Sequence, residues 1–212
     1  MRRLNPGMVL ALLAAGTPAL AHEQHGPAAP TAGDPDCFKA ERDWFTDTEL
    51  VTQAGRPVRF FSDVLRDRVV MVNFMFTQCK DACPLLTDRM IRAADEYTRL
   101  TGKKVSLVSL SVDPVHDTPE ALTVFAAKFG PVADWTLLTG DPARMAEIAR
   151  RLGQVFRDPT DHTTLMLAGH VNARRWAKVP PTDSIEMVAQ RLALLTAPPA
   201  PGAQRVSAAC AG

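Results

Sequence analysis

The sequence predicts an α/β fold in which a central mixed sheet is flanked by helices and preceded by an N-terminal β-hairpin. Apolar runs typical of buried strands alternate with helical segments along residues 38–196, and this alternation is typical of a sheet covered by helices on both faces. Ala54-Gly55-Arg56 separates two short β-prone segments at the start, which indicates a hairpin.

Each element follows from a local pattern. The hairpin strands are expected at residues 49–53 and 58–61. The near-continuous apolar run at 69–74 predicts a strand buried on both faces. Apolar periodicity and turn residues then predict strands at 105–112, 135–138, 163–167 and 174–177, and helices at 84–100, 119–129, 142 to about 153, and 185–195.

Helix boundaries carry capping residues. Thr118 and Asp141 each stand directly before a proline, the order expected of a helix N-cap followed by the first helical position. Asp183-Ser184-Ile185-Glu186 resembles a capping box for the last helix. Gly102 is expected to end the helix that begins at residue 84.

The N-terminus resembles a secretory leader. Arg2 and Arg3 precede a short apolar stretch at residues 8–15, and Ala19-Leu20-Ala21 provides a cleavage signal. We therefore expect a signal peptide at 1–21 and export to the periplasm or another extracytoplasmic space. The stretch is shorter than the ~20 residues needed to span a bilayer, so membrane association is expected only if this segment is not cleaved.

The flanks differ in composition from the body. Residues 22–37 and 197–212 are rich in Pro, Ala and Gly and are expected to be a flexible linker and a flexible tail around a domain at 38–196. Loss of Arg2 and Arg3 lowers Lys+Arg from 24 to 22 against 23 Asp+Glu, so the net charge moves from +1 to −1. A nucleic-acid partner is not expected, because that would require a strongly basic face.

Two cysteines at a strand-to-helix junction are the strongest chemical signal. Cys79 and Cys83 follow the run at 69–74 and precede Pro84, which can start a helix. A helix N-terminus favours the thiolate form of cysteine. Their i,i+4 spacing lets both sulfurs converge on a third object, such as a soft metal ion. Since ligands collect at the carboxyl ends of strands in open α/β sheets, this position favours a thioredoxin-like arrangement.

Four motifs, in this order and spacing, resemble the Sco (SenC) family. They are Phe76-Thr77-x-Cys79-x-Asp81-x-Cys83-Pro84, Ser111-Val112-Asp113-Pro114-x-x-Asp117-Thr118-Pro119-Glu120, Leu138-Thr139-Gly140 and Asp161-His162-Thr163. The family comprises thioredoxin-fold copper-binding proteins that assist assembly of cytochrome c oxidase, and the resemblance covers roughly residues 45–195.

The resemblance implies a copper chaperone rather than an enzyme. Cys79, Cys83 and His162 would hold Cu(I) or Cu(II) and deliver it to the CuA site of cytochrome c oxidase subunit II or to another apo copper protein. A periplasmic thiol reductant would keep the cysteines reduced. The sequence departs from the family pattern at Lys80, where a proline is usual, and in its cleavable-looking N-terminal segment.

Other readings of the cysteine pair remain open. The protein could be a thiol–disulfide oxidoreductase that reduces the cysteines of that subunit or of another exported copper protein, with Cys79 attacking as thiolate and Cys83 resolving. A structural disulfide is the simplest alternative. Zinc would require a fourth ligand that the sequence does not offer, and a peroxidase would require a proline shortly before Cys79.

Several further residues are candidates for accessory roles. Asp161 could orient the His162 ring, whereas His116 is expected to be a solvated loop residue and His170 to lie in a hairpin turn. Asp113 and Asp117 are expected to shape their loop and cap a helix. The remaining candidates are His22 and His25 as weak Cu(II) ligands, Cys37 and Cys210 as a disulfide or as free thiols, and Met71, Met75, Met90, Met145 and Met166 as core residues, of which Met75 adjoins the motif.

Overall fold

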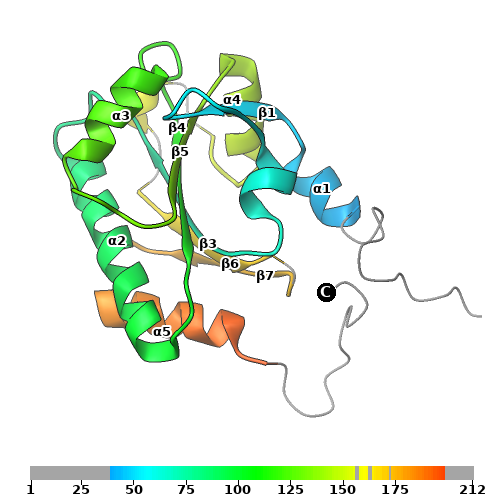
Figure 1. Cartoon of the computed structure of the whole chain (residues 1–212), viewed down its shortest axis with the longest axis vertical. Coiled ribbons are helices and arrows are strands. Elements are labelled where there is room, and N and C mark those ends of the chain that lie inside the picture. Colours follow the sequence, from blue (N-terminus) through cyan, green and yellow to red (C-terminus); the bar gives the residue numbers. More distant parts are fainter. Residues whose placement is uncertain (1–38, 156–157, 162–163, 172, 199–212) are drawn as a thin grey trace, which may run out of the picture.

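A seven-stranded mixed sheet forms the centre of the molecule (Figure 1). The structure is a computed structural model and describes residues 39–155, 158–161, 164–171 and 173–198. The strand order is β2-β1-β5-β4-β3-β6-β7. The strands are β1 (Glu49–Thr52), β2 (Pro57–Arg59), β3 (Val69–Met75), β4 (Ser106–Ser111), β5 (Trp135–Thr139), β6 (Met166–His170) and β7 (Arg175–Val179).

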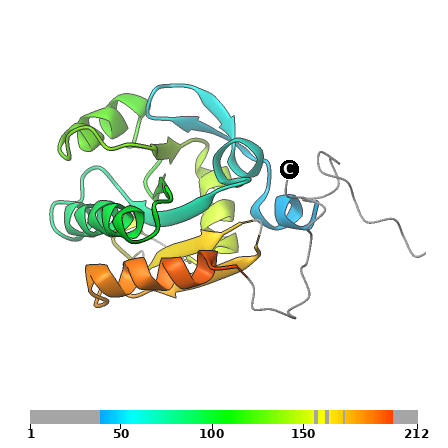
Figure 2. The ribbon, with the colours of Figure 1, turned by 60° about the horizontal axis from the view of Figure 1, so that its bottom comes forward.

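Helices cover both faces of this sheet, as Figures 1 and 2 show. One face carries α2 (Ala82–Thr101), α3 (Pro119–Ala127) and α5 (Ile185–Thr196). The other carries α1 (Lys39–Phe45), the π-helical turn η1 (Phe60–Leu65) and α4 (Pro142–Arg151). A short 3-10 turn, η2 (Pro159–Asp161), precedes β6.

Strand β3 lies between the two hydrophobic cores and contributes to both. Its side chains alternate in direction, as strand geometry requires: Val70, Val72 and Phe74 join the core under α1, η1 and α4, whereas Met71 and Met75 join the core under α2, α3 and α5. All five side chains are at most 2% exposed. This strand is therefore a rigid support for the loop that follows it.

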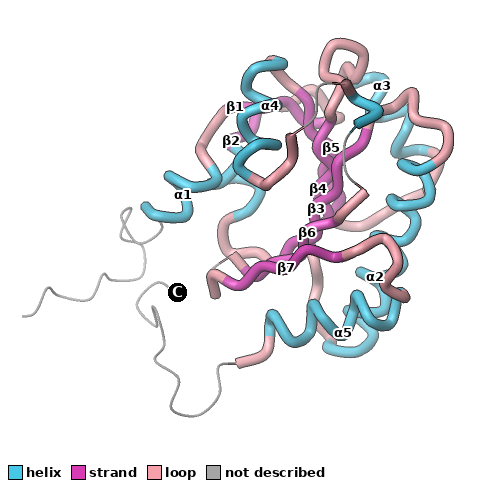
Figure 3. Tube along the Cα trace, turned by 180° about the vertical axis from the view of Figure 1, so that it is seen from behind, coloured by secondary structure: helices cyan, strands magenta, loops and turns pink. Residues whose placement is uncertain are grey.

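Figure 3 shows the strands side by side through the middle of the molecule. Their directions decide which loops meet at each end of the strands. Strands β3, β4 and β5 are parallel, so their carboxyl ends share one edge. Strand β6 runs antiparallel to β3, with Leu167 opposite Val72. The chain therefore enters β6 at the edge where β3 ends.

The structure confirms the expected thioredoxin-like α/β fold and its main elements. The hairpin of β1 and β2 is present. The side chains of Thr118, Asp141 and Ser184 cap α3, α4 and α5 by accepting backbone N–H hydrogen bonds. Gly102 ends α2 in the left-handed conformation, with φ of 69°.

Three local expectations were wrong. Residues 60 and 61 begin the π-helical turn η1 instead of continuing β2. Helix α2 begins at Ala82, two residues before the expected start. Strand β6 begins at Met166 and extends to His170, so this histidine ends a strand instead of lying in a turn. Helix α1 was not expected.

None of the helices in these described residues is long and apolar enough to cross a membrane. The expected signal peptide and linker at 1–37, with His22, His25 and Cys37, lie outside the described residues, as does most of the expected tail with Cys210.

Candidate metal centre

The two motif cysteines lie at the junction of β3 and α2. Cys79 is in the loop between them, and Cys83 is the second residue of α2. Both side chains are thiols, and the Cys83 backbone N–H donates to Cys79 Sγ across 3.2 Å. Since the Asp81 side chain makes no capping hydrogen bond, the Cys79 sulfur serves as the acceptor at this helix N-terminus. A backbone N–H at the positive end of a helix dipole is a suitable donor to a negatively charged sulfur.

The two thiols differ in their access to solvent. Cys83 is completely buried in the core under α2, whereas Cys79 is partly exposed and packs against the edge of that core. Burial raises the pKa of Cys83 to about 12, and its hydrogen bond with Cys79 acts in the same direction. Cys83 therefore keeps its proton at neutral pH, and Cys79 is the sulfur that an incoming ion or thiol meets first.

A buried carboxylate holds the start of the cysteine loop. Asp117 is completely buried; its Oδ1 accepts hydrogen bonds from Thr77 N at 2.9 Å and Thr77 Oγ1 at 2.6 Å. Its Oδ2 accepts from Ser111 Oγ at 2.6 Å. Asp117 thus ties the loop after β3 to the end of β4. This is the loop-shaping role expected for Asp117, whereas the expected helix cap is supplied by Thr118.

A buried polar chain fixes α2 against the sheet one turn beyond Cys83. Asn73 Nδ2 donates to Thr87 Oγ1 at 3.2 Å, and Asn73 Oδ1 accepts from Ser109 Oγ at 2.6 Å. Ser109 in turn accepts from Trp135 Nε1 at 2.9 Å. This chain spans β3, β4, β5 and α2, and its residues are 0–9% exposed. The sequence pattern did not reveal it, because isolated polar residues in apolar strands do not show which helix residue they contact.

The neighbouring loop places Asp113 and His116 together. His116 Nδ1 lies 2.8 Å from Asp113 Oδ2, and the histidine side chain is 59% exposed. Its exposed position agrees with the expected solvated loop residue.

The third expected ligand, His162, lies outside the described residues. Asp161 is the last residue of η2 and is exposed. Within the described part of the chain, no three His, Cys, Asp or Glu side chains gather as a metal site. Five methionines are at most 3% exposed, as expected for core residues: Met71, Met75, Met90, Met145 and Met166.

The donors that are described suit a soft metal. Two thiols meet at a helix N-terminus, one of them accessible from solvent. Thiolate sulfur favours Cu(I) over hard cations such as Mg²⁺ or Ca²⁺. The arrangement can also support thiol–disulfide exchange, because an accessible sulfur lies beside a buried one.

A thioredoxin-like sheet with a thiol pair after its first long parallel strand defines a class of redox and metal-handling domains. A family model described as SCO1/SenC matches residues 40–196. This chain belongs to the SCO1/SenC family.

Individual relatives agree with this assignment. The chain is 33% identical over 124 residues to protein SenC of Rhodobacter capsulatus, covering 54% of this chain and 55% of the relative. It is 35% identical over 91 residues to the SCO1 protein homolog of Bacillus subtilis, covering 42% and 45%. The matched part thus spans about half the length of these curated relatives.

Solved structures show the same fold. A SCO1/SenC family lipoprotein from Bacillus anthracis has a TM-score of 0.61 at 25% identity, over 70% of this chain and 92% of that one. Copper-bound ScoI from Arabidopsis thaliana has a TM-score of 0.61 at 21% identity, over 68% and 92%. Copper is thus a metal held by solved members of the family, as the resemblance implied.

Proposed function

We propose that this protein is an exported copper chaperone that holds copper with Cys79, Cys83 and His162. It would deliver the ion to the CuA site of cytochrome c oxidase subunit II or to another apo copper protein. The observation that carries the proposal is the pair of thiols at the N-terminus of α2, one accessible and one buried. Family membership and copper-bound ScoI support copper as the ion.

The topology supports His162 as the third ligand. Strand β6 begins at Met166 and pairs antiparallel with β3, so the chain approaches β6 from the edge where Cys79 lies. His162 stands four positions before Met166, a length of chain that spans up to about 14 Å.

Loading and release follow from the two sulfurs. Cys83 must lose its proton when it binds the ion, because the thiolate is the metal ligand. The accessible Cys79 would be the first sulfur to bind incoming copper and the one that a recipient reaches for ligand exchange. A thiol reductant in the same compartment would be required, since a Cys79–Cys83 disulfide offers no thiolate.

A copper titration tests the proposal. Reduced protein should bind one Cu(I) or Cu(II) per chain, and His162→Ala should weaken Cu(II) binding most, because imidazole nitrogen tolerates Cu(II) better than thiolate does. The matched control is His116→Ala, which removes an exposed histidine at the same end of the sheet. Equal Cu(II) affinity in His162→Ala and the control would contradict the ligand set.

Thiol–disulfide oxidoreductase activity is the second candidate. The observation that favours it is the contrast between the partly exposed Cys79 and the buried Cys83, which suits an attacking and a resolving sulfur. A reductase should bind copper weakly, and its His162→Ala variant should reduce a disulfide substrate as well as the unmodified protein does. A chaperone should bind copper tightly and reduce the disulfide substrate poorly.

A further inference from the structure

The two ends of the described body meet at the start of β7. Glu41 of α1 forms an ion pair with Arg174, just before β7. Arg175, the next residue, donates a hydrogen bond to the carbonyl of Ala197, directly after α5. Two consecutive arginines thus hold the first helix and the end of the last helix at one corner. The segments that continue beyond residues 39 and 198 leave from this corner.

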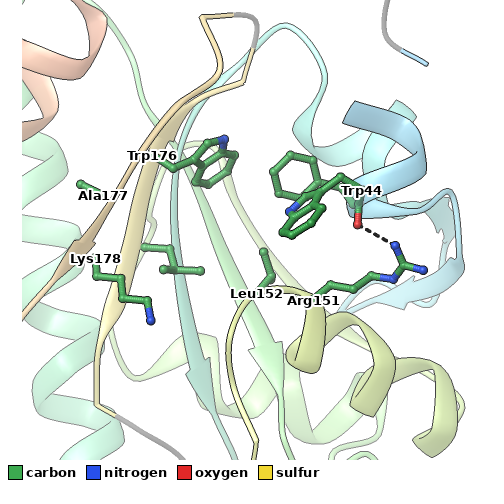
Figure 4. Close-up of a pocket in the computed structure, with 8 residues that line it drawn as sticks. Trp44, Arg151, Leu152, Trp176, Ala177 and Lys178 are labelled. Carbon is green, nitrogen blue, oxygen red and sulfur yellow. Dashed lines mark hydrogen bonds between the residues drawn. The ribbon is translucent and has the colours of Figure 1, made fainter. Parts of the chain in front are cut away.

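An apolar groove of about 370 Å³ lies beside this corner (Figure 4). Trp44 of α1 and Trp176 of β7 face each other across it, and Leu152 forms part of its floor. A second apolar hollow shares Trp44 and Trp176 with the groove and also reaches Glu41 and Arg174, so the lining extends from α4 to the corner.

The large apolar side chain of Trp44 beside the groove is exposed to solvent. Trp44 is 60% exposed, although the neighbouring Phe45 is buried and packs on the Trp176 ring at 5.0 Å between centroids. The exposed indole of Trp44 therefore offers apolar surface beside the groove that a docked segment could cover. Strand β7 is an edge strand, so a segment can pass around it from Ala197 to the groove.

We propose that the C-terminal segment 199–209 of this chain docks in the groove and is held there by a disulfide between Cys37 and Cys210. The segment begins Pro199-Ala200-Pro201, and proline-rich chains dock in aromatic-lined grooves as extended helices that lose little entropy. Its point of departure, Ala197, is bound to the residue preceding Trp176.

The lengths of both flanks suit this path. Cys37 stands two residues before α1, whose Trp44 and Phe45 line the groove. Thirteen residues lead from Ala197 to Cys210, enough to extend about 40 Å. The segment can therefore pass around β7, cross the groove and end beside the start of α1.

The cross-link requires an oxidant of the disulfide class. Cys37 and Cys210 each give up a proton, one S–S bond forms between them, and two electrons reduce the oxidant's S–S bond to two thiols. This S–S pairing uses neither Cys79 nor Cys83, so it would be a structural disulfide. It would lie near the amino end of β3, whereas the candidate metal centre lies beyond the carboxyl end of β3.

Peptide mapping tests the pairing directly. In a Cys79→Ser/Cys83→Ser variant of the full protein, Cys37 and Cys210 are the only cysteines left of four. After oxidation by glutathione disulfide and digestion without reductant, mass spectrometry should find one intrachain peptide joining the two. Mixed disulfides with glutathione on both cysteines, or a disulfide between two chains, would overturn the pairing.

Tryptophan quenching tests the docking. Trp135 is 9% exposed, so acrylamide quenching of the three tryptophans reports mainly on Trp44 and Trp176. Quenching should be weaker in the oxidised protein than in Cys210→Ser, and a variant ending at Pro198 should match Cys210→Ser. Circular dichroism checks that both variants are folded.

Equal quenching in all three proteins would overturn docking in the groove. Protection of the tryptophans that grows with protein concentration would also overturn it, because a second copy would then cover the groove.

Discussion

At the scale of single residues, the candidate centre is asymmetric. The backbone N–H of Cys83 donates a hydrogen bond to the Cys79 sulfur, while burial raises the pKa of the Cys83 thiol. Two chemically identical side chains four residues apart therefore differ in environment: Cys79 is accessible from solvent and Cys83 is buried. Under the proposed function, Cys79 would capture the ion and Cys83 would lose its proton to complete the site.

The two thiols should differ strongly in alkylation. With a pKa of about 12, Cys83 has only about one thiolate in ten thousand at pH 8, and the thiolate is the reactive form. Iodoacetamide should therefore modify Cys79 before Cys83, as measured by mass spectrometry of the reduced protein. In Cys79→Ser, modification of Cys83 should remain slow and should accelerate with pH up to about 12. Rapid modification of Cys83 at pH 8 would show that it is not buried as described.

Asp117 should be a strong determinant of stability, since it accepts three hydrogen bonds in a fully buried position. Asp117→Ala leaves the donors of Thr77 and Ser111 without their acceptor and should lower the free energy of unfolding by about 2–4 kcal/mol. Urea unfolding of the reduced protein measures this. Asp113→Ala, which removes the partner of an exposed histidine, is the control and should lose much less. Equal losses would refute the role of Asp117 as an anchor.

At the scale of elements, the sequence predicted those helices whose boundaries depend on neighbouring residues. Capping residues followed by proline predicted the bounds of α3 and α4 within one or two residues, because a cap bonds to the first turn of its own helix. Helix α1 has only seven residues, and four of them are charged. Its sequence pattern therefore does not distinguish it from a loop. It is held by tertiary contacts, such as the Glu41–Arg174 pair, that no local pattern contains.

The same contrast applies to the candidate centre. The spacing and position of Cys79 and Cys83 predicted a site at a strand-to-helix junction, and the structure has both there. The anchoring of the loop by Asp117 depends on contacts 40 residues apart in sequence, and a single sequence does not show such pairs. The start of β6 was misplaced because the apolar character of residues 163–167 begins before the strand pairs with β3.

The β6–β7 pairing makes a specific demand at Gly169. It lies opposite Trp176, and a Cβ atom at this position would lie 2.3 Å from the indole ring. Gly169→Ala should therefore lower the free energy of unfolding by about 1–3 kcal/mol through overpacking. Gly140→Ala is the matched control, because its Cβ would meet the flexible end of Leu50 at 3.3 Å. Thermal and urea unfolding should rank the two variants in this order, and a loss in Gly140→Ala as large as in Gly169→Ala would contradict it.

At the scale of the whole molecule, the two ends of β3 serve different purposes. The cysteines lie beyond its carboxyl end. Its amino end pairs with His170, which pairs with Arg175 at the corner where both chain flanks leave the body. The length of strand β3 thus separates the candidate centre from the corner where α1 and the end of α5 are held.

Copper binding to the folded centre should stabilise the whole domain. An ion that binds only the native state adds RT ln(1 + [L]/Kd) to the free energy of unfolding, about 2.7 kcal/mol at a free concentration of 100 Kd. For a domain of this size that corresponds to a rise of about 5–10 °C in the unfolding midpoint. Calorimetry of the reduced protein with and without Cu(I) measures the rise, and a Cu(I) chelator should reverse it.

The oxidation state of the cysteines supplies the control for this prediction. A protein with Cys79 and Cys83 joined as a disulfide has no thiolate ligand, so Cu(I) should leave its midpoint unchanged. The Cys79→Ser/Cys83→Ser variant should behave in the same way. A copper-dependent rise that persists in this variant would place the ion elsewhere on the chain, because the thiol pair at the N-terminus of α2 is then gone. Because Cys83 belongs to the core under α2, circular dichroism of the variant checks that it is folded.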